Sequence, residues 1–150
     1  MTDVHDPATR SRNMAAVRAS NTRPELIIRK ALHAAGLRYR LNVRTLPGKP
    51  DIVLPRYRAV VFVHGCFWHR HKCDLFRWPE SRTEFWRNKL DRNAARDQLT
   101  AEALDKAGWR QAVIWECALK GKGKRDFQDT MQCLIAWIRS AEKTITIRGN

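Results

Sequence analysis

An unbroken apolar run, Val60-Val61-Phe62-Val63, limits most strongly what this chain can fold into. No polar residue interrupts it, so it does not alternate as a half-buried strand would. Such a run is typical of a strand in the middle of a sheet, buried on both faces. A second run, Ala112 to Trp115, has the same character. The sequence therefore predicts a sheet that is covered on both faces.

Helix and strand patterns alternate around these two runs. Thr22 and Glu25 form a capping box, Pro24 suits the first turn of the helix that follows, and Gly36 ends that helix. A final amphipathic helix carries Cys133 on its apolar face, where we expect it to be buried. Strands are expected at 38–43, 51–54, 59–63 and 110–116, a long helix at 83–107 and the last helix around 127–138. This order predicts an α/β fold with a mixed sheet.

The length of 150 residues suits one domain and leaves little room for a second core. We expect residues 21–142 to form this domain, 1–20 to be a basic arm that contacts DNA or the body of the domain, and 143–150 to be a loose tail.

The net charge of +14 attracts polyanions, so nucleic acid is the first candidate partner and an anionic membrane surface the second. No apolar run approaches the ~20 residues that span a bilayer, and the polar first residues are unlike a signal peptide. We expect a cytoplasmic protein.

Three cysteines and one histidine form the first candidate site. Cys66, His71 and Cys73 have the spacing Cys-x4-His-x-Cys within one polar loop, and Cys117 follows the second apolar run. Thiolate and imidazole are the ligands that zinc prefers, and a structural ion has all four positions filled by protein. Free cysteines buried as small apolar residues are the alternative. His69 is an alternative to His71 as the histidine ligand, and spacing alone does not choose between them.

A carboxylate and two histidines form the second candidate site. Asp51 opens a strand after Pro50 and, supported by Glu25, could hold Mg²⁺, which binds few protein carboxylates and keeps several waters. The alternative is an exposed aspartate in a turn. His64 and His69 flank the zinc loop, where one could activate water and the other could contact a phosphate.

Large aromatic residues in polar surroundings form a third group. Phe67 and Trp68 lie in the cysteine loop, and Phe85 and Trp86 begin the long helix. They could wedge between base steps and unstack them, as in DNA-kinking proteins. Packing of Phe85 or Trp86 against the sheet is the alternative. The basic residues around this helix would meet phosphates; they are Arg77, Arg82, Arg87, Lys89 and Arg92.

Six segments, in order along the chain, resemble the very short patch repair (Vsr) DNA mismatch endonucleases. They are 9–14 (Thr-Arg-Ser-Arg-Asn-Met), 22–25 (Thr-Arg-Pro-Glu), 46–51 (Leu-Pro-Gly-Lys-Pro-Asp), 64–69 (His-Gly-Cys-Phe-Trp-His), 82–86 (Arg-Thr-Glu-Phe-Trp) and 115–118 (Trp-Glu-Cys-Ala). The resemblance implies a fold like that of type II restriction endonucleases, with a structural zinc ion. It also implies a reaction, the hydrolysis of one phosphodiester 5′ to the thymine of a T·G mismatch left by deamination of 5-methylcytosine.

The resemblance further implies a role for each candidate residue. Asp51 and the backbone carbonyl of Val63 would bind Mg²⁺ directly, and Glu25 would hold a metal-bound water. His69 would be the general base, and His64 would contact the phosphate. The zinc ligands would be Cys66, His71, Cys73 and Cys117, and the wedge would be Phe67, Trp68 and Trp86. A monomer acting on duplex DNA, with a mismatch-repair factor of the MutL type as protein partner, completes this expectation.

One departure concerns the wider restriction-enzyme pattern, in which a Glu-x-Lys pair follows the Pro-Asp element on the next strand. That strand here ends in Val61-Phe62-Val63-His64, so histidine must replace lysine. Two alternative functions stay open. One is a zinc-stabilised DNA-binding module without catalysis, and the other is a restriction-type enzyme that cuts paired or differently mismatched DNA.

Overall fold

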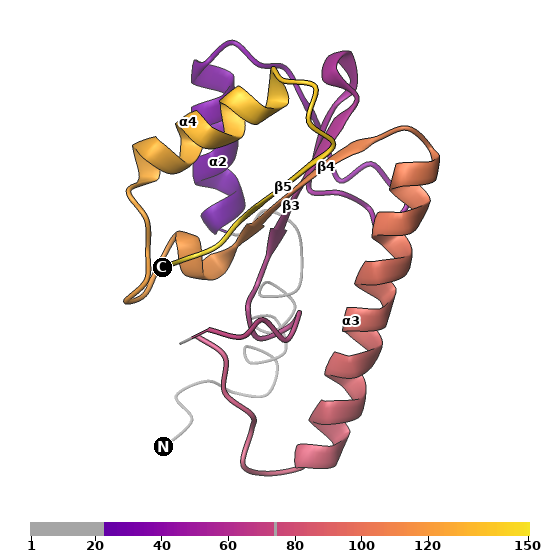
Figure 1. Ribbon diagram of the computed structural model, residues 1–150. Helices are drawn as coiled ribbons and strands as arrows, with labels where there is room; N and C mark the ends of the chain where they lie inside the picture. The colour runs from indigo at the N-terminus through magenta and orange to yellow at the C-terminus, as the bar shows by residue number, and fades with distance from the viewer. Residues whose placement is uncertain (1–22, 74) are drawn as a thin grey trace, which may run out of the picture.

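The computed structural model describes residues 23–73 and 75–150, and Figure 1 shows its arrangement. Within this part, one sheet has the strand order β1-β2-β3-β4-β5. The strands are β1 (Arg40–Leu41), β2 (Ile52–Leu54), β3 (Ala59–His64), β4 (Arg110–Trp115) and β5 (Thr144–Ile147). The helices are α2 (Arg23–Ala34), α3 (Thr83–Lys106) and α4 (Phe127–Ile138), with short 3-10 turns η1 (Pro55–Tyr57) and η2 (Glu116–Ala118).

The sheet is mixed, as the element order predicted. β1, β2 and β3 are antiparallel to one another, whereas β3, β4 and β5 run parallel. Parallel neighbours need crossover connections, which α3 and α4 supply. β3 lies in the middle, with Val61 opposite Ile52 of β2 and Ala112 of β4. The prediction that the apolar run is a central strand is therefore confirmed.

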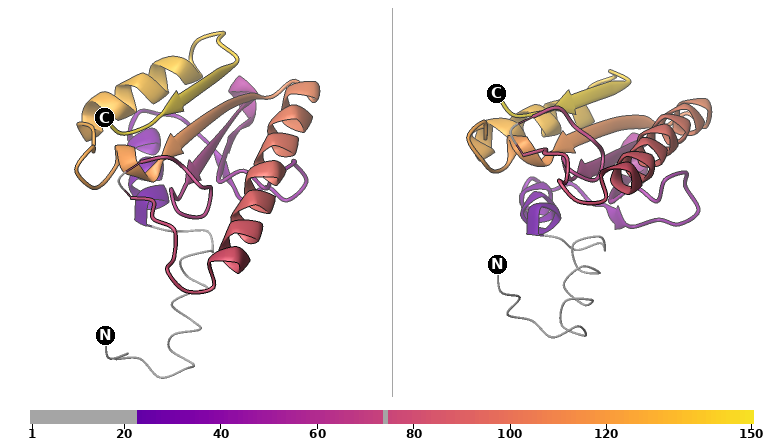
Figure 2. Two further views of the ribbon diagram at one scale, coloured as in Figure 1. Left: turned by 60° about the horizontal axis from the view of Figure 1, so that its bottom comes forward. Right: turned by 90° about the horizontal axis from the view of Figure 1, so that it is seen from below.

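Helices cover both faces of this sheet (Figure 2). On one face, α2 and α4 pack over a core that includes Val61 and Ile114. On the other face, Leu104 of α3 packs with Val60 and Phe62. Successive residues of β3 thus enter different cores, which explains why the strand contains no polar residue before its end.

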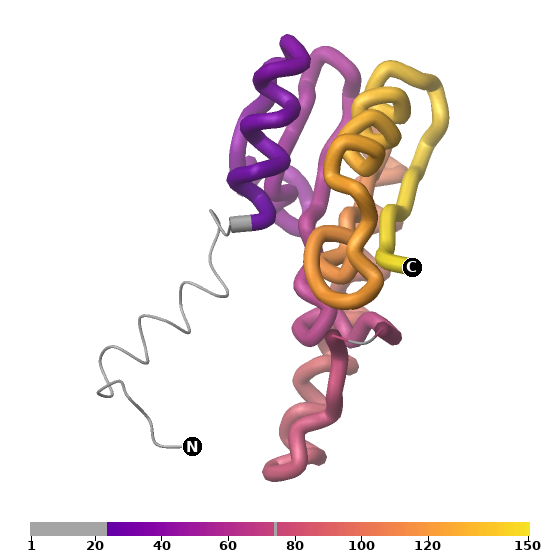
Figure 3. Tube along the Cα trace, turned by 90° about the vertical axis from the view of Figure 1, so that its left-hand side faces the viewer, coloured from indigo at the N-terminus to yellow at the C-terminus, as the bar shows by residue number. Residues whose placement is uncertain are grey.

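Helix α3 extends beyond the sheet. Among its residues only Leu90 and Leu104 are buried, and Figure 3 shows its first turns, with the loop before them, projecting past the ends of the strands. The helix stops before Gly108, whose φ is +83°. There the amide of Gly108 donates to the carbonyl of Asp105, and the amide of Trp109 donates to that of Leu104. The candidate active site lies beside the middle of α3, between Lys89 and Ala101.

Two expectations about the C-terminal part of the chain are wrong. Residues 143–150 are not a loose tail, because Thr144–Ile147 forms β5 beside β4. Its Thr-Ile-Thr-Ile alternation suits the edge of a sheet, and Ile147 is buried. Cys133 is exposed, not buried, because it lies off the stripe that α4 buries. That stripe consists of Thr130, Met131, Leu134, Trp137 and Ile138.

The N-terminal expectations are tested only in part. Residues 1–20, the expected basic arm, and Thr22 of the capping box lie outside the described residues. The expected strand at 38–43 is reduced to β1, because Asn42 has a left-handed backbone (φ +49°) and ends the strand at Leu41. None of the described helices is long and apolar enough to span a membrane.

Candidate active site and metal centre

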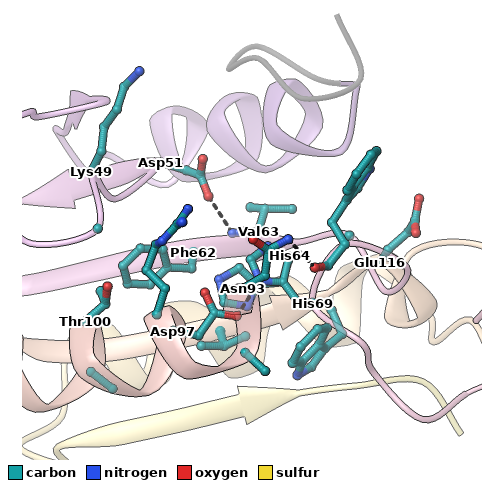
Figure 4. Close-up of a pocket in the computed structure, with 18 of the residues that line it drawn as sticks. Lys49, Asp51, Phe62, Val63, His64, His69, Asn93, Asp97, Thr100 and Glu116 are labelled. Atoms are coloured by element: carbon teal, nitrogen blue, oxygen red, sulfur yellow. Dashed lines mark hydrogen bonds and ion pairs between the residues drawn. The ribbon is translucent and has the colours of Figure 1, made fainter. Parts of the chain in front are cut away.

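A cleft of about 1360 Å³ opens beside α3, where β3 ends (Figure 4). Four residues that the sequence singled out for catalysis line it: Glu25, Asp51, His64 and His69. Asp51 comes immediately before β2, and His64 is the last residue of β3. Because β2 and β3 are antiparallel, the start of one strand lies beside the end of the other.

Asp51 is fixed against the end of β3. The backbone N–H of Val63 donates a hydrogen bond of 2.7 Å to its Oδ2. Burial raises the pKa of Asp51 from 3.8 to about 7, the Val63 hydrogen bond opposes this rise, and the charge of Glu25 adds to it. A carboxyl group in this state is stabilised in its charged form by a nearby cation, so the position suits a metal ligand.

Glu25 approaches Asp51 from α2. It is only 4% exposed, and its Oε2 accepts a hydrogen bond of 3.1 Å from Nη2 of Arg29, one helical turn further on. Arg29 is itself 7% exposed, and its charge lowers the pKa of Asp51. A buried guanidinium thus balances part of the negative charge at the cleft. Sequence reasoning missed Arg29, which has the pattern of an ordinary basic residue on a helix.

The rings of His64 and His69 stack on each other. Their centroids are 3.8 Å apart and their planes are 9° from parallel. Burial, and to a lesser degree the neighbouring His69, lower the pKa of His64 to about 3. His64 is therefore neutral near physiological pH. Among the described residues, nothing hydrogen-bonds to its buried Nδ1.

Asp97 of α3 completes this pair and was missed by sequence reasoning. Its Oδ2 lies 2.5 Å from Nδ1 of His69, both side chains being half-buried. The contact fixes the orientation of the ring and leaves the chemistry of His69 to Nε2. Asn93, one turn earlier on α3, donates to the carbonyl of Trp68 at 3.1 Å and holds the same loop. Asp97 is one of several charged residues on a long helix, and nothing in the neighbouring sequence indicates that it orients a histidine.

The four predicted zinc ligands lie together beside the cleft. The ligand atoms of Cys66, His71, Cys73 and Cys117 are all within 4.8 Å of one another. Nδ1 of His71 is 3.6 Å from Sγ of Cys66 and 3.6 Å from Sγ of Cys117. Bond lengths of ~2.0–2.3 Å around a tetrahedral zinc ion place its ligands roughly 3.5–4 Å apart, so the donor set fits. Since His69 pairs with Asp97, His71 is the histidine that fits a metal here.

Charge and burial suit His71 to this role. Burial lowers its pKa, and the positive charge of Arg148 lowers it further, so the imidazole is held in the neutral form that binds metal. Burial also raises the pKa of the Cys66 thiol. A metal must therefore displace a proton from Cys66, and binding is expected to weaken in acid.

Trp115 connects the metal cluster to the catalytic histidines. Its ring stacks on His71 with centroids 4.1 Å apart and planes 10° from parallel. The rings of His64 and His69 meet it edge-on, at 5.2 and 6.1 Å. The next residue, Glu116, accepts from the backbone N–H of Cys66 at 3.3 Å. The cysteine loop is thus tied to the end of β4 at several points.

The predicted wedge residues form one aromatic cluster. The ring of Phe67 lies 5.2 Å from Trp68 and 5.4 Å from Trp86, and the two tryptophans are 5.9 Å apart. Trp86 packs on this loop, which disfavours the alternative that it packs on the sheet. Phe85 is 42% exposed, so the same alternative is wrong for it. Nζ of Lys89 lies 5.8 Å from the ring of Trp68.

Comparison with known proteins identifies relatives of this chain. The family model described as DNA mismatch endonuclease Vsr matches residues 2–75. The DNA mismatch endonuclease Vsr of Escherichia coli is 45% identical over 138 residues, covering 92% of this chain and 88% of the relative. The chain belongs to the Vsr family of DNA mismatch endonucleases.

Other relatives in the Vsr family are described as nicking enzymes. Type II nicking enzyme V.XorIIP of Xanthomonas oryzae pv. oryzae is 50% identical over 123 residues, 82% of this chain and 90% of the relative. Type II nicking enzyme V.NmeAIP of Neisseria meningitidis is 44% identical over 122 residues, 81% of this chain and 87% of the relative. The chain is therefore a DNA-cleaving hydrolase.

Proposed function

We propose that this Vsr-family enzyme is a magnesium-dependent endodeoxyribonuclease that nicks one strand 5′ to the thymine of a T·G mismatch. Such mismatches arise when 5-methylcytosine deaminates, so the nick would start very short patch repair. The observation that carries the proposal is the meeting of Asp51, His64 and His69 in one cleft. The name of the Escherichia coli relative, a DNA mismatch endonuclease, supports the substrate class.

Asp51 and the backbone carbonyl of Val63 are the proposed Mg²⁺ ligands. In a strand, the N–H and C=O of one residue face the same neighbouring strand. The carbonyl of Val63 therefore faces the same side as the N–H that binds Asp51. Glu25 would accept hydrogen bonds from waters at this position. Bound there, Mg²⁺ would polarise the phosphate and ease deprotonation of the attacking water.

His69 is the proposed general base. Because its Nδ1 is engaged by Asp97, it would take the proton of the attacking water at Nε2. The Asp97 carboxylate would then stabilise the imidazolium that forms, so Asp97 is a positioning residue. His64, which is neutral, would donate a hydrogen bond to a phosphate oxygen.

The aromatic cluster is proposed to enter the DNA at the mismatch. Phe67, Trp68 and Trp86 would insert between base steps, where they would replace base stacking with contacts to aromatic rings. A mismatched step costs less to unstack than a paired one, so the wedge itself would favour a T·G site. The net charge of +14 would supply affinity for the phosphates on either side.

The remaining parts of the proposal are structural. Zinc is the proposed ion for Cys66, His71, Cys73 and Cys117, and it would take no part in the chemistry because protein fills all four positions. The mixed sheet between helices supports a restriction-endonuclease-like fold. A monomer in the bacterial cytoplasm is enough for a single nick at an asymmetric mismatch. A mismatch-repair partner of the MutL type stays a prediction.

The test is an Asp51→Ala variant incubated with Mg²⁺ and a labelled T·G duplex. We expect nicking to be lost while binding of the duplex is kept, because the wedge and the basic surface are unchanged. Asp105→Ala, an exposed aspartate at the far end of α3, is the matched control and should nick at the wild-type rate. Substantial nicking by Asp51→Ala would overturn the metal assignment.

A further inference from the structure

The chain after β5 runs directly over the cysteine cluster. The backbone N–H of Gly149 donates a hydrogen bond of 3.3 Å to Sγ of Cys117, and this contact is buried. Cys117 is the one member of the cluster that lies outside the loop of residues 66–73. The hydrogen bond therefore reaches the sulfur through which a bound metal would join that loop to the end of β4.

Two glycines allow this close approach. A Cβ added at Gly149 would overlap the backbone carbonyl of Cys117 and would lie 2.8 Å from the carbonyl oxygen of Gly123. A Cβ added at Gly123 would lie 2.6 Å from the carbonyl oxygen of Asn150. Side chains at either position would force backbone segments apart, so glycine is required by contact.

Further hydrogen bonds hold the segment in place. The amide of Asn150 donates to the carbonyl of Gly123 at 2.8 Å. Nε of Arg125 donates to the carbonyl of Arg148. The residues of β5 just before them pair with β4, which leads to Cys117. These hydrogen bonds and the pairing of β5 with β4 thus hold the N–H of Gly149 against the sulfur.

We propose that residues 148–150 are a structural part of the metal centre, in which the N–H of Gly149 stabilises the thiolate of Cys117 and retains the bound ion. This inference rests on the zinc site proposed above. A thiolate ligand carries negative charge, and a donor aimed at it makes a charge-assisted hydrogen bond. The same backbone covers the sulfur of Cys117, a residue that is 5% exposed, and so hinders release of the ion. Groups that hydrogen-bond to metal ligands typically contribute about 10–100-fold to metal affinity.

Two shortened chains test this inference as a matched pair. The chain ending at Gly149 loses Asn150 but keeps the donor, whereas the chain ending at Arg148 loses the donor as well. Zinc transfer to a chromogenic chelator at neutral pH is measured, with circular dichroism as the check on folding. We expect the chain ending at Arg148 to release zinc about 10–100-fold faster than the full chain. The chain ending at Gly149 loses the hydrogen bond from Asn150 to Gly123 but keeps the donor to the sulfur and the bond from Arg125 to Arg148. It should therefore stay within about threefold of the full chain.

A second measurement uses the full chain and needs no variant. In protein loaded with NMR-active cadmium in place of zinc, the amide proton of Gly149 should show scalar coupling to the metal through the N–H···S bond. Equal release by both shortened chains and no such coupling would overturn the inference while leaving the zinc site intact. A wild-type protein that binds neither zinc nor cadmium would instead overturn the proposed zinc site.

Discussion

At the residue scale, Asp51 is a carboxyl group that its surroundings favour in the neutral form. Burial raises its pKa in the folded protein from 3.8 to about 7. Between these pH values Asp51 keeps its proton in the folded protein but has released it in the unfolded chain. The unfolding free energy therefore falls as the pH rises, and above about pH 7 the folded protein bears the full cost of the buried charge. We expect Asp51→Asn, which lacks this penalty, to be more stable than the wild type at pH 8 by about 1–3 kcal/mol.

Urea unfolding of the two proteins side by side at pH 4 and pH 8 measures this difference, with magnesium omitted. Near pH 4 the two proteins should have similar unfolding free energies, because Asp51 is protonated in the folded wild type. Addition of magnesium at pH 8 should stabilise the wild type more than Asp51→Asn. A wild type that is as stable as the variant at pH 8 would contradict the burial argument.

Asp97 gives a second prediction at this scale. We expect Asp97→Asn to slow nicking by about 10²–10⁴-fold with little change in DNA binding, because an amide cannot stabilise the imidazolium of His69 as a carboxylate does. As Asp97 acts through His69, the loss should appear in the single-turnover rate of cleavage and not in the affinity for the duplex. A role confined to holding the loop would weaken binding of the duplex as well.

Asp91 provides the matched control for Asp97. It lies on the same helix and pairs with Arg70 of the same loop, but it contacts neither catalytic histidine in any described interaction. Asp91→Asn should therefore nick at close to the wild-type rate. A loss of rate as large as that of Asp97→Asn would mean that holding the loop on α3, and not orienting His69, is what matters.

At the element scale, the first turns of α3 and the cysteine loop form one aromatic projection. Trp86 is packed within it against Phe67 and Trp68, whereas Phe85 of the same turn is exposed beneath Arg82. We expect Trp86→Ala to weaken binding to a T·G duplex by about 1–3 kcal/mol, because it removes a stacking surface. Fluorescence anisotropy without Mg²⁺ measures the affinity, and the control is Leu99→Ala, which removes an exposed apolar side chain of α3 outside the cluster. Equal losses in both variants would argue against a wedge.

The cysteine loop gives a second prediction at this scale. Cys117 is 5% exposed and joins the loop to the end of β4. We expect Cys117→Ala to abolish stoichiometric zinc and to lower the melting temperature by about 10 °C, because metal binding contributes to folding. Cys133→Ala removes an exposed cysteine of α4 and should change neither property. Metal analysis and thermal unfolding decide, and an unchanged Cys117→Ala protein would refute the site.

Elements whose pattern lies within their own residues were predicted from the sequence. The apolar runs of β3 and β4 indicate buried strands, and Gly108 indicates the end of α3. β5 could not be found this way, since a four-residue alternation becomes a strand only by pairing with β4. Asp97 escaped for the same reason, because its meaning depends on where α3 passes His69. Spacing left His71 and His69 open as the metal ligand, the resemblance to the Vsr family implied His71, and the contact of His69 with Asp97 favours that choice.

At the scale of the whole molecule, one end of the sheet gathers every part of the proposed function. Asp51 just before β2, His64 at the end of β3 with His69 after it, and Cys117 after β4 all lie there. α3 and the cysteine loop project from the same end and carry the aromatic cluster. A chain of charge +14 would bring this end to DNA by long-range attraction, and the aromatic cluster would then select the step that unstacks most easily.

Nicking of a panel of labelled duplexes tests this account most directly. The duplexes share one flanking sequence and differ only at a single position. That position carries the T·G mismatch, a different mismatch, or one of the paired controls T·A and C·G. With Mg²⁺ and the wild-type chain, we predict a single nick 5′ to the thymine of T·G and at least about tenfold slower cutting of the paired duplexes, since unstacking a paired step costs about 1–3 kcal/mol more. Equal cutting of paired and mispaired DNA, or no cutting of any duplex, would contradict it.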